Sequence, residues 1–252
     1  MDVMDTDPAW YEQDEFWKTC EHFLFPPKSF EEAREQVEKL TEMLGLEPPA
    51  RVLDMPSGVG RHAVSLADRG FAVTAVDRTE HYLQAIDEQA AMVVGDVECV
   101  CADMREFAGD GSYDVVLNLF SSFGYFADRE EDKLVAQNFY KSLTPGGRLV
   151  VDMNGKEILA NDFHSRTWHE ADGSYLLEEC HLTDGWSWME NRWIVIREGE
   201  IRTFDVSHRL YSGYELAEVL RQAGFANVSL FGSFDGDPYD QDAERLIAIA
   251  EK

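Results

Sequence analysis

Two aspartates and two glycines in the first third of the chain have the spacing of a nucleotide-binding site. A short apolar run ends at Asp54, the turn after it carries Gly58 and Gly60, and a second apolar run ends at Asp77. Glycines let the backbone approach a ligand closely, a helix that begins at the turn offers free amides, and an acid after the second strand can bind ribose hydroxyls. These residues therefore predict a strand–turn–helix–strand unit that binds a nucleotide.

The turn fits the patterns of two families. Gly58-x-Gly60-x-x-Ala63 satisfies the dinucleotide pattern, which is a weak signal by itself. Asp54 before the turn, with residues 1–49 upstream of it, favours another family: residues 50–77 resemble motif I of the class I S-adenosylmethionine-dependent methyltransferases. Pro56 replaces the first glycine of that motif and Ser57 its frequent cysteine, so the sequence departs from the family at the turn itself.

Further segments follow in the order in which the methyltransferase family has them. A third strand is predicted at 97–101, before Asp103 and Met104, a fourth at 113–118, and a Pro-Gly-Gly turn with a fifth strand at 143–151. The resemblance implies that S-adenosylmethionine is the cofactor, with its methionine end at Asp54 and the glycines, its ribose at Asp77 and its adenine at Asp103 and Met104. The cofactor-binding residues that it implies are Tyr11, Asp54, Pro56, Gly58, Gly60, Arg61, Asp77, Arg78, Asp103, Met104 and Asn118.

These elements must be positioned by an α/β fold, and we expect a doubly wound, seven-stranded, mainly parallel sheet of the Rossmann-like methyltransferase type. Strands at 225–231 and 245–250 are expected to close it as an antiparallel hairpin. Residues 162–211 are predicted to insert a small antiparallel cap of three strands (174–184, 186–198 and 200–212), because Asp184-Gly185 is a hairpin signal. The expected organisation is a helical lid at 1–47, a cofactor-binding core at 48–161 and 212–252, and the cap at 162–211.

The N-terminal segment is expected to cover the cofactor. Residues 8–24 have the pattern of one amphipathic helix with an aromatic face, and Ser29-Phe30-Glu31-Glu32 resembles a capping box that opens a second helix, to about Leu44. Small-molecule methyltransferases often fold such a helix over the cofactor, and Tyr11 is the predicted lid contact. Packing of an amphipathic helix against the core is the alternative.

Methyl transfer from S-adenosylmethionine needs little from the protein beyond alignment and exclusion of water, unless the acceptor keeps its proton and needs a base. Residues 119–126 resemble the loop of small-molecule and amino-sugar N-methyltransferases in which some members place a histidine base, and Tyr125 stands there instead. A phenol with a pKa near ~10 is a poor base at neutral pH. Tyr125 and His181, on a cap strand, are the candidate catalytic residues, and the acceptor atom is nitrogen or oxygen of a small molecule.

Composition limits the partners. The formal net charge of −27 repels phosphate backbones, so nucleic acid is a poor substrate, and no apolar run of membrane-spanning length exists. The acidic N-terminus does not resemble a signal peptide, which favours a cytoplasmic protein. The four cysteines form no CxxC pair, so no metal site is expected, and Cys99 and Cys101 are expected to be buried thiols. Many acids beside only seven lysines also suit a salt-rich cytoplasm, a hypothesis that unfolding midpoints measured across a molar salt series would test.

Two other functions remain open from the sequence. An NAD-dependent oxidoreductase would use the same glycine turn, although it does not account for Asp103 or for the Pro-Gly-Gly turn. A protein that binds S-adenosylmethionine without turnover is the second alternative, because no assured base is present. The tryptophan-rich cap is also a candidate contact for a homodimer.

Overall fold

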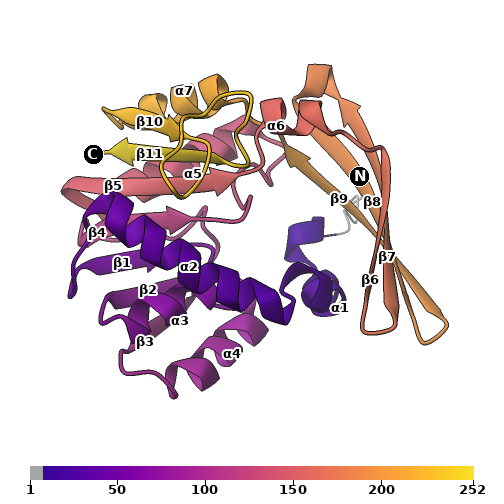
Figure 1. The fold of residues 1–252 in the computed structure, drawn as a ribbon, viewed down its shortest axis with the longest axis horizontal. Helices are drawn as coiled ribbons and strands as arrows, with labels where there is room; N and C mark the ends of the chain where they lie inside the picture. Colours follow the sequence, from indigo (N-terminus) through magenta and orange to yellow (C-terminus); the bar gives the residue numbers. More distant parts are fainter. Residues whose placement is uncertain (1–7) are drawn as a thin grey trace, which may run out of the picture.

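The computed structural model describes residues 8–252 as a large twisted sheet covered by helices, with a smaller sheet beside it (Figure 1). Residues 1–7, which include the start of the predicted lid and most of the acidic N-terminal stretch, lie outside the described residues. The large sheet has the strand order β10-β11-β5-β4-β1-β2-β3. Its strands are β1 (Arg51–Asp54), β2 (Ala72–Asp77), β3 (Val97–Cys101), β4 (Tyr113–Asn118), β5 (Leu143–Met153), β10 (Val228–Phe231) and β11 (Leu246–Glu251).

The pairing of these strands confirms the predicted fold. Strands β1 to β5 run parallel, and β11 joins β5 antiparallel and pairs with β10 as the expected terminal hairpin. Buried parallel strands are near-continuous apolar runs, which is why the sequence marks β1, β2 and β4 clearly. Strand β5 begins at Leu143, so the Pro-Gly-Gly segment lies inside it, at a shift in register against β4.

Helices cover both faces of the large sheet. One face packs against α2 (Pro27–Leu44), α3 (Arg61–Asp68) and α4 (Glu80–Ala90), and the other against α5 (Arg129–Ser142) and α7 (Gly213–Ala223). Helix α7 begins at a capping box in which Ser212 and Glu215 bond to each other's backbone amides. The crossover helices thus bury both faces, and only the strand ends are left to form a ligand site.

The smaller sheet is the cap, and it has four antiparallel strands rather than the three expected. They are β6 (Arg166–Ala171), β7 (Ser174–Thr183), β8 (Trp188–Arg197) and β9 (Glu200–Arg209), preceded by the short helix α6 (Lys156–Asn161). A 3-10 turn, η2 (Asp184–Trp186), joins β7 to β8. Strand β6 was not predicted because RTWHEA has neither an apolar run nor clear alternation, and it lies mostly exposed at the edge of the sheet.

The N-terminal segment packs between the cap and the core. The predicted single helix over 8–24 is wrong in its first half: a 3-10 turn, η1 (Trp10–Glu12), is separated by Gln13 from α1 (Asp14–Leu24). Trp10, Phe16 and Cys20 are buried against the inner face of the cap, where Leu176 and Phe204 lie. Within η1, Trp10 packs toward the cap, where its Nε1 donates to the Ser207 carbonyl at 2.7 Å, and Tyr11 also packs against the core.

Two smaller expectations are also wrong. The capping box at Ser29 does not form, because α2 begins at Pro27, where proline suits the first helical turn, and Ser29 is buried within that turn. Cys101 is exposed and Cys99 only half-buried, since β3 is the edge strand of the large sheet. No helix in the described range 8–252 combines the length and the apolar character that crossing a membrane requires.

Candidate functional site

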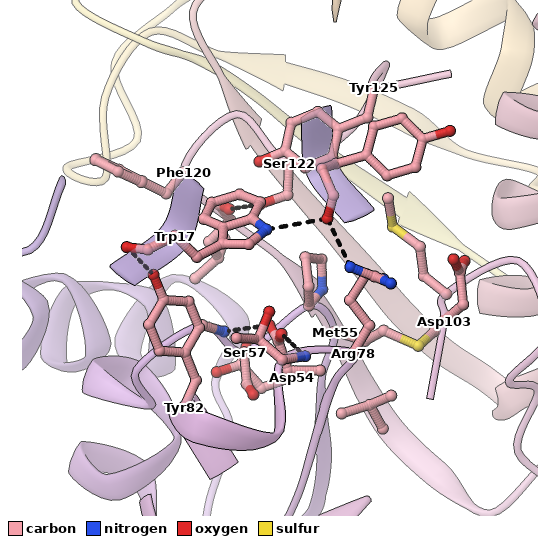
Figure 2. Close-up of a pocket in the computed structure, with 18 of the residues that line it drawn as sticks. Trp17, Asp54, Met55, Ser57, Arg78, Tyr82, Asp103, Phe120, Ser122 and Tyr125 are labelled. Carbon is pink, nitrogen blue, oxygen red and sulfur yellow. Dashed lines mark hydrogen bonds between the residues drawn. The ribbon is translucent and has the colours of Figure 1, made fainter. Parts of the chain in front are cut away.

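A cavity opens where the parallel strands end, at the place where doubly wound sheets bind ligands. It contains about 980 Å³ of empty space with its mouth included, within the range of roughly 300–1,000 Å³ for small-molecule sites. Figure 2 shows the side chains around it. Its wall is built from residues 54–58 after β1, 77–79 after β2, 102–104 after β3 and parts of 119–126 after β4, and residues of the N-terminal segment cover it.

The glycine turn after β1 is fixed by contacts with buried residues of β4 and α4. Asn118 is fully buried at the end of β4 and donates from Nδ2 to the Met55 carbonyl at 2.9 Å. Gly60 has φ +76°, and a Cβ there would lie 2.3 Å from the Ile86 side chain. Neither residue lines the cavity. Gly60 is therefore required by packing against α4, and Asn118 acts by fixing the backbone that leads into the turn.

Two opposite charges beside the glycine turn are buried, and neither makes an ion pair within residues 8–252. Asp54 is 1% exposed, and within residues 8–252 its Oδ2 has no hydrogen-bond partner. Burial raises the pKa of Asp54 to about 7, against the opposing effect of the Arg61 charge. Arg61 is 6% exposed, and the one hydrogen bond from its side chain to another described residue goes to the Ser29 carbonyl at 3.5 Å. Both residues line the cavity, so both charges are available to a ligand.

The second strand end presents Asp77, which is buried and binds the turn. Its Oδ2 accepts from the Gly58 amide and its Oδ1 from the Thr79 amide, both at 2.8 Å. Burial raises the pKa of Asp77, and these amide bonds oppose the rise. Each carboxylate oxygen accepts two hydrogen bonds at full capacity, so Asp77 can still accept from ligand hydroxyls.

The third strand end presents Asp103 and Met104, and here the acid is paired. Arg105 donates from Nε to Oδ1 of Asp103 at 3.0 Å and from Nη2 to Oδ2 at 2.8 Å. Burial alone would raise the pKa of Asp103, but the bonds from Arg105 outweigh it and hold the pKa below its ordinary value. Arg105 also bonds to Glu12 of η1 and Glu131 of α5, so it connects the N-terminal segment to this end of the cavity.

The N-terminal segment is tied to the core through the Tyr11 carbonyl. Trp17 donates to it from Nε1 at 3.0 Å and Arg78 from Nη1 at 2.9 Å, as the dashed lines in Figure 2 show. Tyr82 of α4 donates its hydroxyl to the Trp17 carbonyl at 3.2 Å. Tyr11, Trp17, Arg78 and Tyr82 all line the cavity, so the N-terminal segment forms part of its wall.

Of the two candidate catalytic residues, the structure brings only Tyr125 to the cavity. Its ring lies among those of Trp10, Tyr11 and Trp17, and burial raises its pKa to about 12. His181 is a correction: it is exposed on β7 and does not line the cavity. Strand alternation turns Leu176 inward on β7, and therefore His181 outward.

The structure thus assembles most, but not all, of the expected residues. Ten line the cavity: Tyr11, Asp54, Pro56, Gly58, Arg61, Asp77, Arg78, Asp103, Met104 and Tyr125. Sequence reasoning missed Trp17 and Tyr82 as wall residues and Arg105 as the partner of Asp103. Arg105 follows Asp103 by two residues, and a basic residue so close to a predicted binding acid was a usable signal.

Comparison with known proteins identifies the same region. Residues 52–147 match a family model described as a methyltransferase domain. Over 213 residues the chain is 27% identical to a putative methyltransferase, YqeM, of Bacillus subtilis (strain 168), with 82% of this chain and 86% of that protein covered. A glycine/sarcosine/dimethylglycine N-methyltransferase of Actinopolyspora halophila is 28% identical, with 80% of this chain and 36% of that protein covered. Among solved structures, the CcbJ methyltransferase of Streptomyces caelestis superposes with a TM-score of 0.75 at 24% identity, covering 86% of this chain and 88% of that chain.

Proposed function

The chain belongs to the S-adenosylmethionine-dependent methyltransferases, and from that premise we propose that it transfers a methyl group to nitrogen or oxygen of a small-molecule acceptor. The name of the Actinopolyspora relative, an N-methyltransferase, supports nitrogen. The methyltransferase domain match spans the glycine turn and the strand ends that line the cavity.

The observation that carries the proposal is the pair of unmatched charges beside the glycine turn. An amino-acid end of a ligand has one ammonium and one carboxylate, and the turn offers Asp54 for the first and Arg61 for the second. Buried charges are costly unless they are paired, so a site that keeps two opposite charges apart is suited to a zwitterion. The methionine portion of S-adenosylmethionine is such a zwitterion.

The rest of the cavity suits the nucleoside portion. Asp77 has acceptor capacity for the ribose hydroxyls, and Asp103 with Met104 would meet the adenine amine and ring. NAD, the cofactor of the alternative oxidoreductase, has no amino-acid end to use Asp54 and Arg61 together. Asp103 accepts three hydrogen bonds from Arg105, two of them at Oδ1, so the pairing fixes the direction of the carboxylate and leaves one lone pair of Oδ2 for the adenine.

The bound cofactor supplies the reactive methyl group and its own leaving group, so the task of the protein is alignment. Trp17, Phe120 and Tyr125 line the cavity with aromatic surface that excludes water. His62 is the one histidine in the described lining, and it is bonded to Gln36 with a pKa lowered by burial to about 3. With Tyr125 also unsuited to take a proton at neutral pH, we infer that the acceptor reacts as a neutral amine or loses its proton to water.

Calorimetric titration with S-adenosylhomocysteine, beside NAD, is the direct test. We expect S-adenosylhomocysteine to bind and NAD to give no heat, and Asp77→Ala to weaken the binding by about 1–3 kcal/mol, as expected for a lost charged hydrogen bond. A methyl-transfer assay with simple amines, amino sugars and hydroxylated acceptors then separates an enzyme from a protein that only binds the cofactor. Binding of NAD without S-adenosylhomocysteine would contradict the proposal.

The predicted homodimer through the cap remains a separate proposal. The outer face of the cap exposes Trp168 and Ile201, which are 64% and 67% accessible to solvent. Light scattering of the chain and of a Trp168→Ser, Ile201→Ser variant tests it, because a cap-mediated dimer should dissociate in the variant.

A further inference from the structure

The loop after β4 contains two consecutive residues in a backbone conformation that side chains disfavour. Phe120 has φ 62° and Ser121 φ 60°, both in the left-handed region, and neither is glycine. Such residues persist only where the surrounding structure holds them, and they are common at ligand sites. Phe120 lines the cavity, so the strained pair lies in the wall of the proposed cofactor site.

Asp152, near the end of β5, holds this pair in place. Its Oδ2 accepts from the Phe120 amide at 3.0 Å and its carbonyl from the Ser121 amide at 2.9 Å. Asp152 is 5% exposed, and Arg245 fixes its carboxylate with bonds of 2.7 Å to Oδ1 and 3.0 Å to Oδ2. Asn154 adds a bond from its amide to the Ser121 hydroxyl at 3.0 Å. The conformation of the loop is therefore fixed from the neighbouring strand.

The held conformation places the Phe120 ring on Arg61. The guanidinium carbon of Arg61 lies 4.1 Å from the centre of the Phe120 ring, closer than the 5.9 Å to Phe25. A planar guanidinium stacks on an aromatic face with its donors free at the edge. Burial lowers the pKa of Arg61, and the negative charge of Asp152 is the first of the effects that oppose this. Asp152 therefore supports Arg61 through Phe120, and its charge favours the Arg61 cation against the opposing charge of Arg245.

We propose that Asp152, fixed by Arg245, is a positioning residue that orients Arg61 toward the carboxylate of the ligand through the strained Phe120–Ser121 turn. This inference rests on the proposed function, because it assumes a ligand with an amino-acid end. Asp152 itself does not line the cavity, so its effect on a ligand must pass through the residues that it holds.

Two ligands that differ in the amino-acid end distinguish positioning from general damage. S-adenosylhomocysteine carries the carboxylate, and 5′-methylthioadenosine has the same nucleoside and thioether without it. We expect Asp152→Asn to weaken binding of S-adenosylhomocysteine at least tenfold and to change the affinity for 5′-methylthioadenosine less than twofold. Phe120→Leu, which leaves Asp152 intact and removes the aromatic face, should weaken S-adenosylhomocysteine three- to tenfold with the same selectivity.

The matched control is Asp235→Asn, which breaks an exposed ion pair with Lys39 away from the cavity and should change neither affinity. Equal loss of both ligands in Asp152→Asn, or no loss of either, overturns the inference. If Asp152→Asn does not fold, Phe120→Leu decides by the same comparison. Failure of the wild-type chain to bind S-adenosylhomocysteine would instead overturn the proposed function, so the two failures are distinguishable.

Discussion

Two buried aspartate–arginine combinations in this molecule differ in whether the charges meet. At the seam between core and cap, Arg209 of β9 donates from Nε to Asp132 of α5 at 3.0 Å, and from Nη2 to the Phe126 and Ala127 carbonyls. At the glycine turn, Asp54 and Arg61 are equally buried, yet no ion pair joins them among the described residues. The first combination attaches the cap to the core, and the second leaves two charges facing a cavity.

The difference shows that burial of a charge does not by itself mark a functional site. Arg209 has protein acceptors for its donors, so its charge is used within the fold. Asp132 also keeps one oxygen, Oδ1, without a partner among the described residues, but its charge is paired with Arg209. Asp54 and Arg61 keep hydrogen-bonding capacity and make no ion pair within the described protein, which costs folding free energy unless a ligand supplies the partners. We therefore expect substitutions at the seam to change stability and substitutions at the turn to change binding.

The largest expected effect is that of Arg209→Ala on stability. Removing the arginine leaves the Asp132 carboxylate buried without its cation, which typically costs about 3–5 kcal/mol. Chemical denaturation at pH 8 measures the loss. Arg192→Ala, at an exposed arginine of the cap, is the control and should cost less than about 1 kcal/mol. If Arg209→Ala loses no more unfolding free energy than Arg192→Ala, the Arg209–Asp132 pair does not stabilise the contact between core and cap.

Asp54→Asn, in contrast, should weaken ligand binding and not the fold. Loss of the charge that meets the ligand ammonium should weaken S-adenosylhomocysteine by about 10- to 100-fold, the range for a charged hydrogen bond. The ligand-free protein should become more stable at pH 8, on the order of 2 kcal/mol, because a buried unpaired carboxylate is replaced by a neutral group. Calorimetry and denaturation of the same sample measure both quantities. A variant that loses stability and retains affinity would contradict the contrast.

Because the pKa of Asp54 is raised, both the stability of the ligand-free protein and its affinity for the ligand should depend on pH. The raised value of about 7 means that the ligand-free protein binds a proton that the unfolded chain releases near pH 4, so this contribution to stability is present below pH 4 and is lost as the pH rises through 7. The ligand ammonium selects the ionised form. Affinity for S-adenosylhomocysteine should therefore be full above pH 7 and fall by up to tenfold per unit below it.

Calorimetry at pH 6 in two buffers of different ionisation enthalpy should detect release of up to one proton on binding. The Asp54→Asn variant should show no such release, which separates Asp54 from other titrating groups. Affinity that does not change between pH 6 and 8 in the wild-type chain would show that Asp54 does not meet the ligand charge.

The sequence predicted the parts of the fold whose pattern is local. Strands β1 and β2 are apolar runs that end at acids, and the order of the predicted strands along the chain sufficed to predict the sheet. Strand β6 could not be found because its register is set by pairing with β7 rather than by its own residues. The break at Gln13 was missed for a related reason, because Trp10 leaves the helix to bury itself against β9, far away in the sequence.

The site residues divide in the same way, into those that a local sequence pattern predicts and those that only long-range packing determines. The acids at the ends of β1, β2 and β3 were predictable because parallel strands end at one edge of the sheet. His181 was misplaced because the adjacent Leu176 and Leu177 are compatible with either face of β7, and only packing against the N-terminal segment selects Leu176. The link from Arg105 to Glu12 joins residues 93 positions apart, which no local pattern indicates.

The smallest expected effects come from replacing one tyrosine by phenylalanine at the seam between core and cap and one in the cavity. Tyr211 donates its hydroxyl to the buried Asp132 at 2.7 Å, whereas Tyr125 lines the cavity with a pKa raised by burial to about 12. Tyr211→Phe should cost about 1–2 kcal/mol of stability and leave turnover per folded molecule unchanged. Tyr125→Phe should change turnover less than about threefold, because a phenol that holds its proton at neutral pH gives little general-base catalysis. Initial rates at saturating cofactor, measured beside denaturation curves, compare the two. A hundredfold fall in turnover for Tyr125→Phe, with stability unchanged, would make the hydroxyl a catalytic group and would mean that the ligand, once bound, lowers its pKa.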